Sequence, residues 1–247
     1  MVTTALAVVP LLAALLVAPS DPPAAPSVKP SAAEEAKEAS PDAGRLGDPV
    51  KLFDGTSLAG WKPFLSGGDP AKVWSVRDGV VVCTGNPVGY IATEKEYESF
   101  ELTLEWRFDA SKGDGNSGVL MRVQGPDKVG NEFTWPRSVE AQLQSKSAGD
   151  IWNIGDVPMK VNTERTKGRH TAKAHPTNEK PLGEWNRYRI VLNGGTLELY
   201  VNDLLQNTAT DVEVKPGRIA LQSEGAHIEF RNIVLRPFNA PLPATGR

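Results

Sequence analysis

The sequence predicts an all-β fold, a jelly-roll-like sandwich of two antiparallel sheets. Short segments in which apolar and polar residues alternate recur through most of the chain, with turn residues such as Asp-Gly and Asn-Gly between them. This is the pattern of strands joined by hairpins. No ten-residue window repeats apolar residues at helical spacing, so the chain lacks the crossover helices that a parallel α/β sheet requires. Two antiparallel sheets packed face to face accommodate such a chain.

The first expected elements are short strands. Lys51 to Trp61 contains a strand, an Asp-Gly turn and a tryptophan that we expect to close the edge of the domain. Trp74–Arg77 and Val80–Val82 follow as two strands joined by Asp78-Gly79, a strong hairpin signal. Cys83, the single cysteine, comes directly after three valines, so we expect a small buried side chain.

The longest expected strand runs from Phe100 to Phe108, where every second residue is a large apolar one and the residues between are polar or charged. This alternation predicts one buried and one solvated face. The C-terminal part predicts a meander of strands over Trp185–Leu192, Thr196–Val201, Leu204–Asn207, Gly217–Gln222 and Ile228–Leu235.

The strand of greatest functional interest is Ser138–Ser145, because its alternation is strict. The expected core face carries Val139, Ala141 and Leu143, and the opposite face carries Glu140, Gln142 and Gln144. A carboxylate between two carboxamides offers a base flanked by donors and acceptors, which suits the hydroxyl groups of a sugar. An ordinary solvated face of an antiparallel sheet is the alternative interpretation.

Two long loops favour the sugar-binding interpretation. After a short loop, Val119–Arg122 re-enters the sheet and leads toward the Glu140 strand. Gly125–Arg137, with Phe133 and Trp135, and Gly149–Lys180, with Trp152, are expected to be irregular. Long loops that carry aromatic side chains beside one polar strand predict a walled cleft in which rings stack on a sugar.

The N-terminus predicts export. Residues 1–20 resemble a signal peptide, with an apolar run from Ala5 to Ala18 and a small-residue cleavage site, although no basic residue precedes the run. A membrane anchor is the alternative, but about 14 apolar residues fall short of the ~20 that a spanning helix needs. Residues 21–47 predict a disordered Pro/Ala-rich linker, 48–238 one β-sandwich domain and 239–247 a tail. We expect an extracytoplasmic protein without a membrane span in its mature form.

Composition and motifs exclude several function classes. The net charge is −3, from 27 basic and 30 acidic residues, which does not favour a nucleic-acid partner. The chain contains no Gly-rich phosphate loop, no Gly-x-Ser-x-Gly elbow and no His-Glu-x-x-His motif. The three histidines, His170, His175 and His227, are too scattered for a metal motif. We expect neither a cofactor nor a metal.

The chemistry centres on Glu140. A usual glycosidase needs two carboxyl groups, ~5–5.5 Å apart for retention or ~6.5–9.5 Å for inversion, and this strand supplies one. A second carboxyl group would come from Glu132, Asp150, Glu164 or Glu224. Alternatively, the mechanism needs only one carboxyl group. Arg122 would either hold a substrate oxygen or form a salt bridge with Glu140. We therefore predict Glu140 and Arg122 as catalytic, with a substrate shell of Asn116, Gln142, Gln144, Trp152, His170, Gln222 and Glu224.

A set of short motifs resembles one known family. In order, these are Asp54-Gly55-Thr56-Ser57-Leu58 with Gly60-Trp61, Asn116-Ser117-Gly118 running to Arg122, Glu140-x-Gln142, Gly183-Glu184-Trp185-Asn186, Gly217-x-Ile219-x-Leu221-Gln222, and Phe230-Arg231-Asn232-Ile233. Together they are similar to the 3-keto-disaccharide hydrolase family over about Val50 to Pro237. The resemblance implies a concanavalin A-like sandwich outside the cytoplasm. It also implies cleavage of glycosides whose sugar has been oxidised at C3 by a partner dehydrogenase.

A ketone at C3 makes the C2 proton acidic, so a single base can start elimination of the C1 substituent, and water then adds to the enone. One carboxylate suffices for this route. The chain departs from the family pattern at Ser145, where an acidic residue is expected, and at Glu224, which stands where a histidine is expected after the Leu-Gln pair. A non-catalytic carbohydrate-binding module and a tethered interaction domain are the alternative functions. A lectin would gain little from a carboxylate such as Glu140 in the middle of its site.

Overall fold

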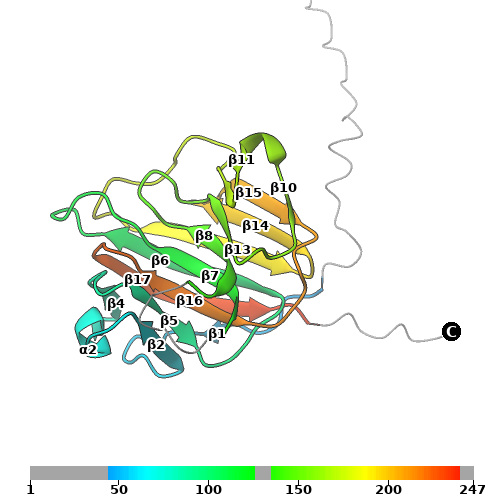
Figure 1. Cartoon of the computed structure of the whole chain (residues 1–247). Coiled ribbons are helices and arrows are strands. Elements are labelled where there is room, and N and C mark those ends of the chain that lie inside the picture. The colour runs from blue at the N-terminus through cyan, green and yellow to red at the C-terminus, as the bar shows by residue number, and fades with distance from the viewer. Residues whose placement is uncertain (1–43, 126–134, 240–247) are drawn as a thin grey trace, which may run out of the picture. The chain divides into compact units, whose positions relative to one another are not determined.

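The computed structural model describes residues 44–125 and 135–239 (Figure 1). The chain divides into two units, Met1–Ser40 and Pro41–Arg247, and all the described residues fall in the second. The predicted signal peptide (1–20), the predicted linker up to residue 43 and the predicted tail from residue 240 lie outside the described residues. So does the loop segment 126–134, with Glu132 and Phe133.

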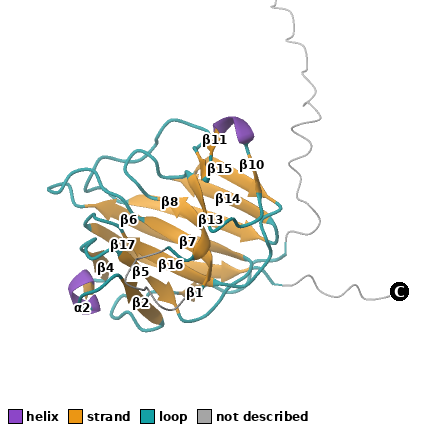
Figure 2. Cartoon of the chain, viewed as in Figure 1, coloured by secondary structure: helices purple, strands orange, loops and turns teal. Residues whose placement is uncertain are grey.

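The described part is built almost wholly of strands, and its only helical parts are α2 (Pro70–Val73) and the single turn η1 (Thr163–Arg165) (Figure 2). One sheet has nine strands, eight of them in the order β10-β15-β14-β13-β6-β17-β4-β3, with β1 on β17. Their bounds are β10 Lys160–Val161, β15 Leu204–Thr210, β14 Thr196–Val201, β13 Asn186–Asn193, β6 Phe100–Phe108, β17 Ile228–Pro237, β4 Val80–Cys83, β3 Trp74–Arg77 and β1 Val50–Lys51.

The other sheet has eight strands in the order β11-β12-β9-β8-β7-β16-β5-β2. Their bounds are β11 Thr166–Lys167, β12 His170–Thr171, β9 Ile151–Ile154, β8 Arg137–Gln142, β7 Gly118–Gln124, β16 Arg218–Ser223, β5 Gly89–Thr93 and β2 Trp61–Leu65. All strand pairs are antiparallel. The predicted all-β sandwich of two antiparallel sheets is therefore confirmed.

The main hydrophobic core lies between the sheets. Along β6 every residue from Phe100 to Phe108 alternates between buried and half-buried, as its pattern predicts. From the eight-stranded sheet, β7 contributes Val119 and Met121, and β8 contributes Val139 and Ala141. Because strand side chains alternate between faces, the residues between these point away from the core. This places Glu140 and Gln142 on the outer face of the eight-stranded sheet.

Several local predictions are confirmed. β3 and β4 pair through Asp78-Gly79, and both turn residues have positive φ (50° and 76°), as a type I′ hairpin requires. Trp61 is buried and its indole Nε1 donates to the carbonyl oxygen of Leu52 at 2.6 Å. Cys83 is fully buried.

Two predictions differ from the structure. Gly149–Lys180 is not an irregular loop, because it contains the four short strands β9 to β12 and η1. Three of these strands have two residues each, which is too short to show alternation. Residues 44–47, assigned to the linker, pair with the end of the domain: Leu46 bridges to Phe238, and the Asn239 amide donates to the Arg45 carbonyl oxygen at 3.0 Å.

Candidate functional site

The polar residues of the central strand meet those of its neighbours on the outer face of the eight-stranded sheet. Gly118 of β7 lies opposite Gln142 of β8. On the other side of β7, Val119 pairs with Leu221, which brings Gln222 beside Gly118. Two residues before Gln142 on β8, Glu140 lies between Leu120 of β7 and Trp152 of β9.

Gly118 forms the floor between two functional side chains. A Cβ atom on Gly118 would lie 2.3 Å from Gln222 Oε1 and 2.5 Å from Glu140 Oε1, well inside the contact distance of nonbonded atoms. The two side chains therefore use the space that any larger residue would fill. Gly118 allows Glu140 and Gln222 to converge above the sheet.

Glu140 is a buried carboxyl group, with 5% of its surface exposed. Burial, followed by the negative charge of Glu224, raises the pKa of Glu140 to about 8, and the Gln222 amide and the Arg169 guanidinium act in the opposite direction. Burial also raises the pKa of Glu224, against the effect of Arg169. A carboxyl group with such a pKa is tuned for proton transfer near neutral pH.

Two amide oxygens near Glu140 lack partners among the described residues. Gln222 Oε1, on a side chain that is 1% exposed, and Asn116 Oδ1 are both buried without a hydrogen bond. Unsatisfied buried acceptors are costly, so they are expected to receive hydrogen bonds from a ligand. Asn116 lines a cavity of about 360 Å³, together with Asp114, Gly115, Gln144, Ser145, Glu224, Gly225 and Ala226.

Ser145, one of the two departures from the family pattern, has a structural role in this cavity. Its Oγ accepts from the Gly115 amide at 2.9 Å, and its amide donates to the Gly115 carbonyl oxygen at 2.9 Å. These bonds fix the loop that carries Asn116. Glu224, the second departure, lies half-buried in the cavity wall.

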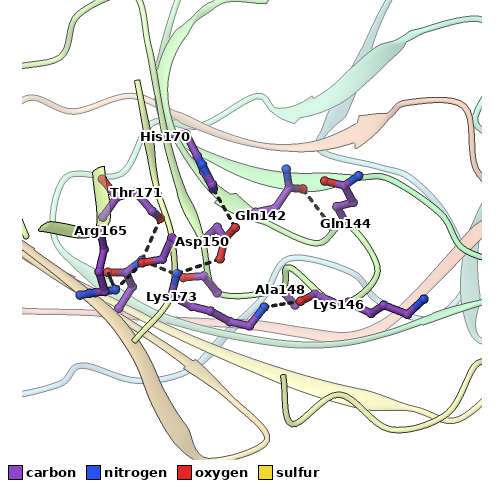
Figure 3. Close-up of polar contacts among 12 residues, drawn as sticks. Gln142, Gln144, Lys146, Ala148, Asp150, Arg165, His170, Thr171 and Lys173 are labelled. Atoms are coloured by element: carbon purple, nitrogen blue, oxygen red, sulfur yellow. Dashed lines mark hydrogen bonds and ion pairs between the residues drawn. The ribbon is translucent and has the colours of Figure 1, made fainter. Parts of the chain in front are cut away.

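Of the two glutamines after Glu140, Gln142 lies on the predicted face, whereas Gln144 lies beyond the strand, because β8 ends at Gln142. The Gln142 side-chain oxygen accepts from the amides of Leu143 and Gln144, both at 2.8 Å, and so closes the strand end (Figure 3). Gln144 is exposed and lines the cavity. The structure thus brings both glutamines to the site, but the oxygen of Gln142 is already bound.

A second polar group lies on β9 and β12, beyond Trp152. His170 pairs with Trp152 across the strands, and their rings stack with centroids 4.6 Å apart. His170 Nε2 lies 2.7 Å from Asp150 Oδ2, as Figure 3 shows. The guanidinium of Arg169, at the tip of the β11–β12 hairpin, lies 5.1 Å from the Trp152 ring centroid.

Arg122 does not belong to this site, and its predicted contact with Glu140 is wrong. The Arg122 guanidinium donates to four carbonyl oxygens, those of Glu98, Gly194, Val212 and Glu213. β7 is irregular between Met121 and Gln124, where Arg122 has a φ of 51°. This bulge puts Val123 rather than Arg122 on the face of Leu120. Arg122 therefore ties β7 to turns around the nine-stranded sheet.

Arg122→Met is expected to lower the free energy of unfolding by about 3–5 kcal/mol, because it leaves several buried carbonyl oxygens without donors. Specific activity per folded molecule should stay near that of the wild type. Chemical denaturation with a parallel activity assay measures both quantities. Arg187→Met is the matched control, because the exposed Arg187–Asp203 ion pair should contribute less than ~1 kcal/mol. A stable but inactive Arg122→Met variant would restore the original assignment.

Sequence reasoning missed two contributors, Gly118 and Arg169. Gly118 carries no chemical group, and only the convergence of its neighbours reveals its part. Arg169 lies in the segment predicted as a loop, where the Lys-Gly-Arg-His sequence between two threonines was the available hairpin signal. Of the proposed second carboxylates, Glu224 and Asp150 lie at the site, whereas Glu164 lies exposed in η1.

Two properties concern the described residues as a whole. In residues 44–125 and 135–239, no group of three or more His, Cys, Asp or Glu side chains is arranged to hold a metal ion. Within the same ranges, no helix has the length and apolar character needed to cross a membrane.

The chain is similar to known proteins in family model, in sequence and in structure. Residues 48–236 match the model of the 3-keto-alpha-glucoside-1,2-lyase-like domain. A 3-keto-disaccharide hydrolase of Bacteroides thetaiotaomicron is 28% identical over 225 residues, 74% of this chain and 76% of the relative. A crystal structure from Parabacteroides distasonis, described as that of a glycosyl hydrolase, superposes with a TM-score of 0.56 at 22% identity, covering 85% of this chain and 99% of that one.

The fold is shared more widely. The β-glucanase of Bacillus licheniformis superposes with a TM-score of 0.53 at 13% identity, covering 78% of this chain and 99% of that one. At these identities the two structural matches establish the fold alone, a concanavalin A-like sandwich.

Proposed function

Because the chain belongs to the 3-keto-alpha-glucoside-1,2-lyase-like domain family, we propose that it cleaves glycosides whose sugar carries a ketone at C3. The relative at 28% identity is named for hydrolysis of 3-keto-disaccharides, and a hydrolase of the same kind is the function proposed here. The observation that carries the proposal is the buried carboxyl group of Glu140, which lies beside Gln222 on a polar sheet face.

Glu140 is proposed to act as the base. A C3 ketone acidifies the neighbouring C2 hydrogen, so Glu140 removes this proton, the C2–H electron pair forms the C1=C2 bond, and the bond from C1 to the glycosidic oxygen breaks. Water then adds across the C1=C2 bond, and the released ketosugar carries a hydroxyl group at C1. A carboxylate whose pKa is raised to about 8 is a stronger base than an ordinary glutamate and suits a weakly acidic C–H group.

Other groups are placed to bind the ketosugar. Arg169, whose charge acts on both Glu140 and Glu224, takes the role that we predicted for Arg122: it favours the ionised base and polarises the ketone. Gln222 and Asn116 offer acceptors to sugar hydroxyl groups. Trp152 offers the edge of a ring already stacked on His170.

The biological setting follows from the substrate. A 3-ketoglycoside arises by oxidation of a glycoside, so a sugar 3-dehydrogenase is proposed to act upstream. The apolar run from Ala5 to Ala18 supports the proposal that the protein works outside the cytoplasm.

A turnover assay in deuterated water tests this mechanism. If elimination operates, the ketosugar released from a 3-keto-glucoside should carry deuterium at C2, because solvent replaces the abstracted proton during hydration. Mass spectrometry or NMR of the product measures this, and the free ketosugar incubated without enzyme gives the background exchange. Incorporation no faster than background would reject elimination in favour of direct displacement with Glu224 or Asp150 as the second carboxylate. Binding without any turnover would instead favour the lectin-like alternative.

A further inference from the structure

The Asp150–His170 pair is fixed more firmly than a surface ion pair. Asp150 is buried, with 6% of its surface exposed, and its two oxygens have separate partners. Oδ1 accepts from the Lys173 backbone amide at 2.9 Å, and Oδ2 lies 2.7 Å from His170 Nε2. A carboxylate held by the backbone in this way sets the orientation of the imidazole bound to it.

A face of the imidazole ring is also constrained. The Trp152 ring stacks on it with an interplanar angle of 25°. His170 is nevertheless accessible, with 29% of its side chain exposed. In the parts of the chain that the structure describes, the second ring nitrogen, Nδ1, forms no hydrogen bond. The ring therefore has one nitrogen anchored and one free for a ligand.

The position of His170 relative to Glu140 suits the two ends of an elimination. Glu140, Trp152 and His170 follow one another across the strands β8, β9 and β12. Backbones two strands apart are separated by roughly 10 Å. Trp152 lies between them on the same face of the sheet, so a sugar placed over its side chain would have Glu140 at one end and His170 at the other.

Elimination also needs a proton at the end where the bond breaks. The base that takes the C2 proton is occupied at that moment, and an alkoxide is a poor leaving group unless it is protonated. Glu224 is one candidate for this acid, because burial raises its pKa and so favours its protonated form. The imidazole of His170 is the other candidate, and it differs from Glu224 in having its orientation fixed by the buried carboxylate of Asp150.

We propose that His170, oriented by Asp150, is the acid that protonates the departing glycosidic oxygen. This inference rests on the elimination proposed above. Glu140 first takes the C2 proton, which leaves the enolate of the C3 ketone. The C1–O bond then breaks as the Nδ1–H proton of the His170 imidazolium passes to the leaving oxygen, which gives the enone and a free alcohol. In the hydration step neutral His170 takes a proton from water as the hydroxyl adds to C1, and Glu140, whose proton has exchanged with solvent, returns a proton to C2. Both groups end in their starting states, and one water is consumed.

The test varies the leaving group. In His170→Asn, turnover of a methyl 3-keto-glucoside should fall by ~10²-fold or more, because general acid catalysis contributes about that much. Turnover of the 4-nitrophenyl 3-keto-glucoside should fall less than ~10-fold, since nitrophenolate departs without protonation. A loss of similar size for both substrates would overturn the acid role and leave His170 as a binding residue.

A second readout separates the two proton transfers. With the acid removed and the base intact, the methyl substrate recovered from His170→Asn in deuterated water should carry deuterium at C2 above the enzyme-free background. Cleavage should remain slow. Recovered substrate without excess deuterium would show that proton abstraction itself is lost, which also contradicts the proposal.

Control variants protect the interpretation. Asp150→Asn should show the same selective loss on the methyl substrate, with a smaller magnitude. His175→Asn, at an exposed histidine, should affect neither substrate. If His170→Asn does not fold, as judged by circular dichroism, His170→Gln and Asp150→Asn carry the test. If the wild-type protein turns over neither substrate, the proposed function fails. Wild-type turnover with unselective losses in the variants rejects only the role of His170.

Discussion

Glu140→Gln is expected to lower turnover of a 3-keto-glucoside by about 10³-fold or more, because the amide keeps the shape of the side chain and removes the proposed base. Affinity for the substrate should change little, since the neighbouring amides and aromatic rings remain. Steady-state kinetics together with a binding measurement separates the two effects. Glu184→Gln, at an exposed glutamate, is the matched control. Full activity of Glu140→Gln would remove Glu140 from the mechanism.

The same variant should reveal the unusual ionisation of Glu140. The pKa of Glu140 is about 8 in the folded protein and 4.5 for an ordinary glutamate, so between these values the folded state holds a proton that the unfolded state has lost. The contribution of neutral Glu140 to stability is therefore complete below pH 4.5 and is lost as pH rises to about 8. The slope is on the order of 1.4 kcal/mol per pH unit.

Glutamine has no such dependence. Glu140→Gln should match the wild type in melting temperature near pH 4.5 and exceed it near pH 8.5, as thermal denaturation at the two pH values would measure. A constant difference at both pH values would mean that Glu140 titrates normally.

Gly118→Ala is expected to lower kcat/KM by about 10²-fold or more. The new methyl group would lie at 2.3 Å from Gln222 Oε1 and 2.5 Å from Glu140 Oε1, so both side chains must turn away. Misplacement of a catalytic group by about 1 Å can cost this much. Stability should fall by less than the activity loss suggests, because the clash falls on the ends of side chains and alanine suits a strand better than glycine does.

The matched control is Gly67→Ala, at an exposed position where a Cβ atom would meet nothing within 4 Å. Kinetics and thermal denaturation of both variants test the expectation. Wild-type kcat/KM in Gly118→Ala would show that the convergence of Glu140 and Gln222 is not needed for catalysis.

Much of the fold could be predicted because the alternation of apolar and polar residues along a strand shows which face of the strand is buried. The segment from Phe100 to Phe108 has one apolar face, and the structure has the expected strand with this face buried. The same alternation correctly predicted that Glu140 lies on the face opposite Val139 and Ala141. The sheet orders could not be predicted, since strands far apart in the chain pair through contacts that no local pattern records.

Site residues were predicted correctly where side chains alternate regularly between the two faces of a strand, and wrongly where a bulge interrupts this alternation. Arg122 lies two residues after Leu120 and should share its face, but the bulge in β7 turns its side chain away. The bulge arises from the positive φ of Arg122, which is not visible in the residue types around it. Asp150 and His170 are 20 residues apart in the chain, and their pairing depends on the neighbouring short strands β9 and β12, which alternation cannot reveal.

The position of β16 has a consequence for biosynthesis. This strand lies near the end of the chain, yet it is inserted between β7 and β5 in the middle of the sheet. Until the ribosome has released Arg218–Ser223, β5 and β2 have no strand through which to join β7 and β8. Gln222 and the Glu224 wall of the cavity arrive in this same final segment. A nascent or truncated chain that ends before β16 therefore contains Glu140 without Gln222 and Glu224, and the site is completed only after this segment has been synthesised.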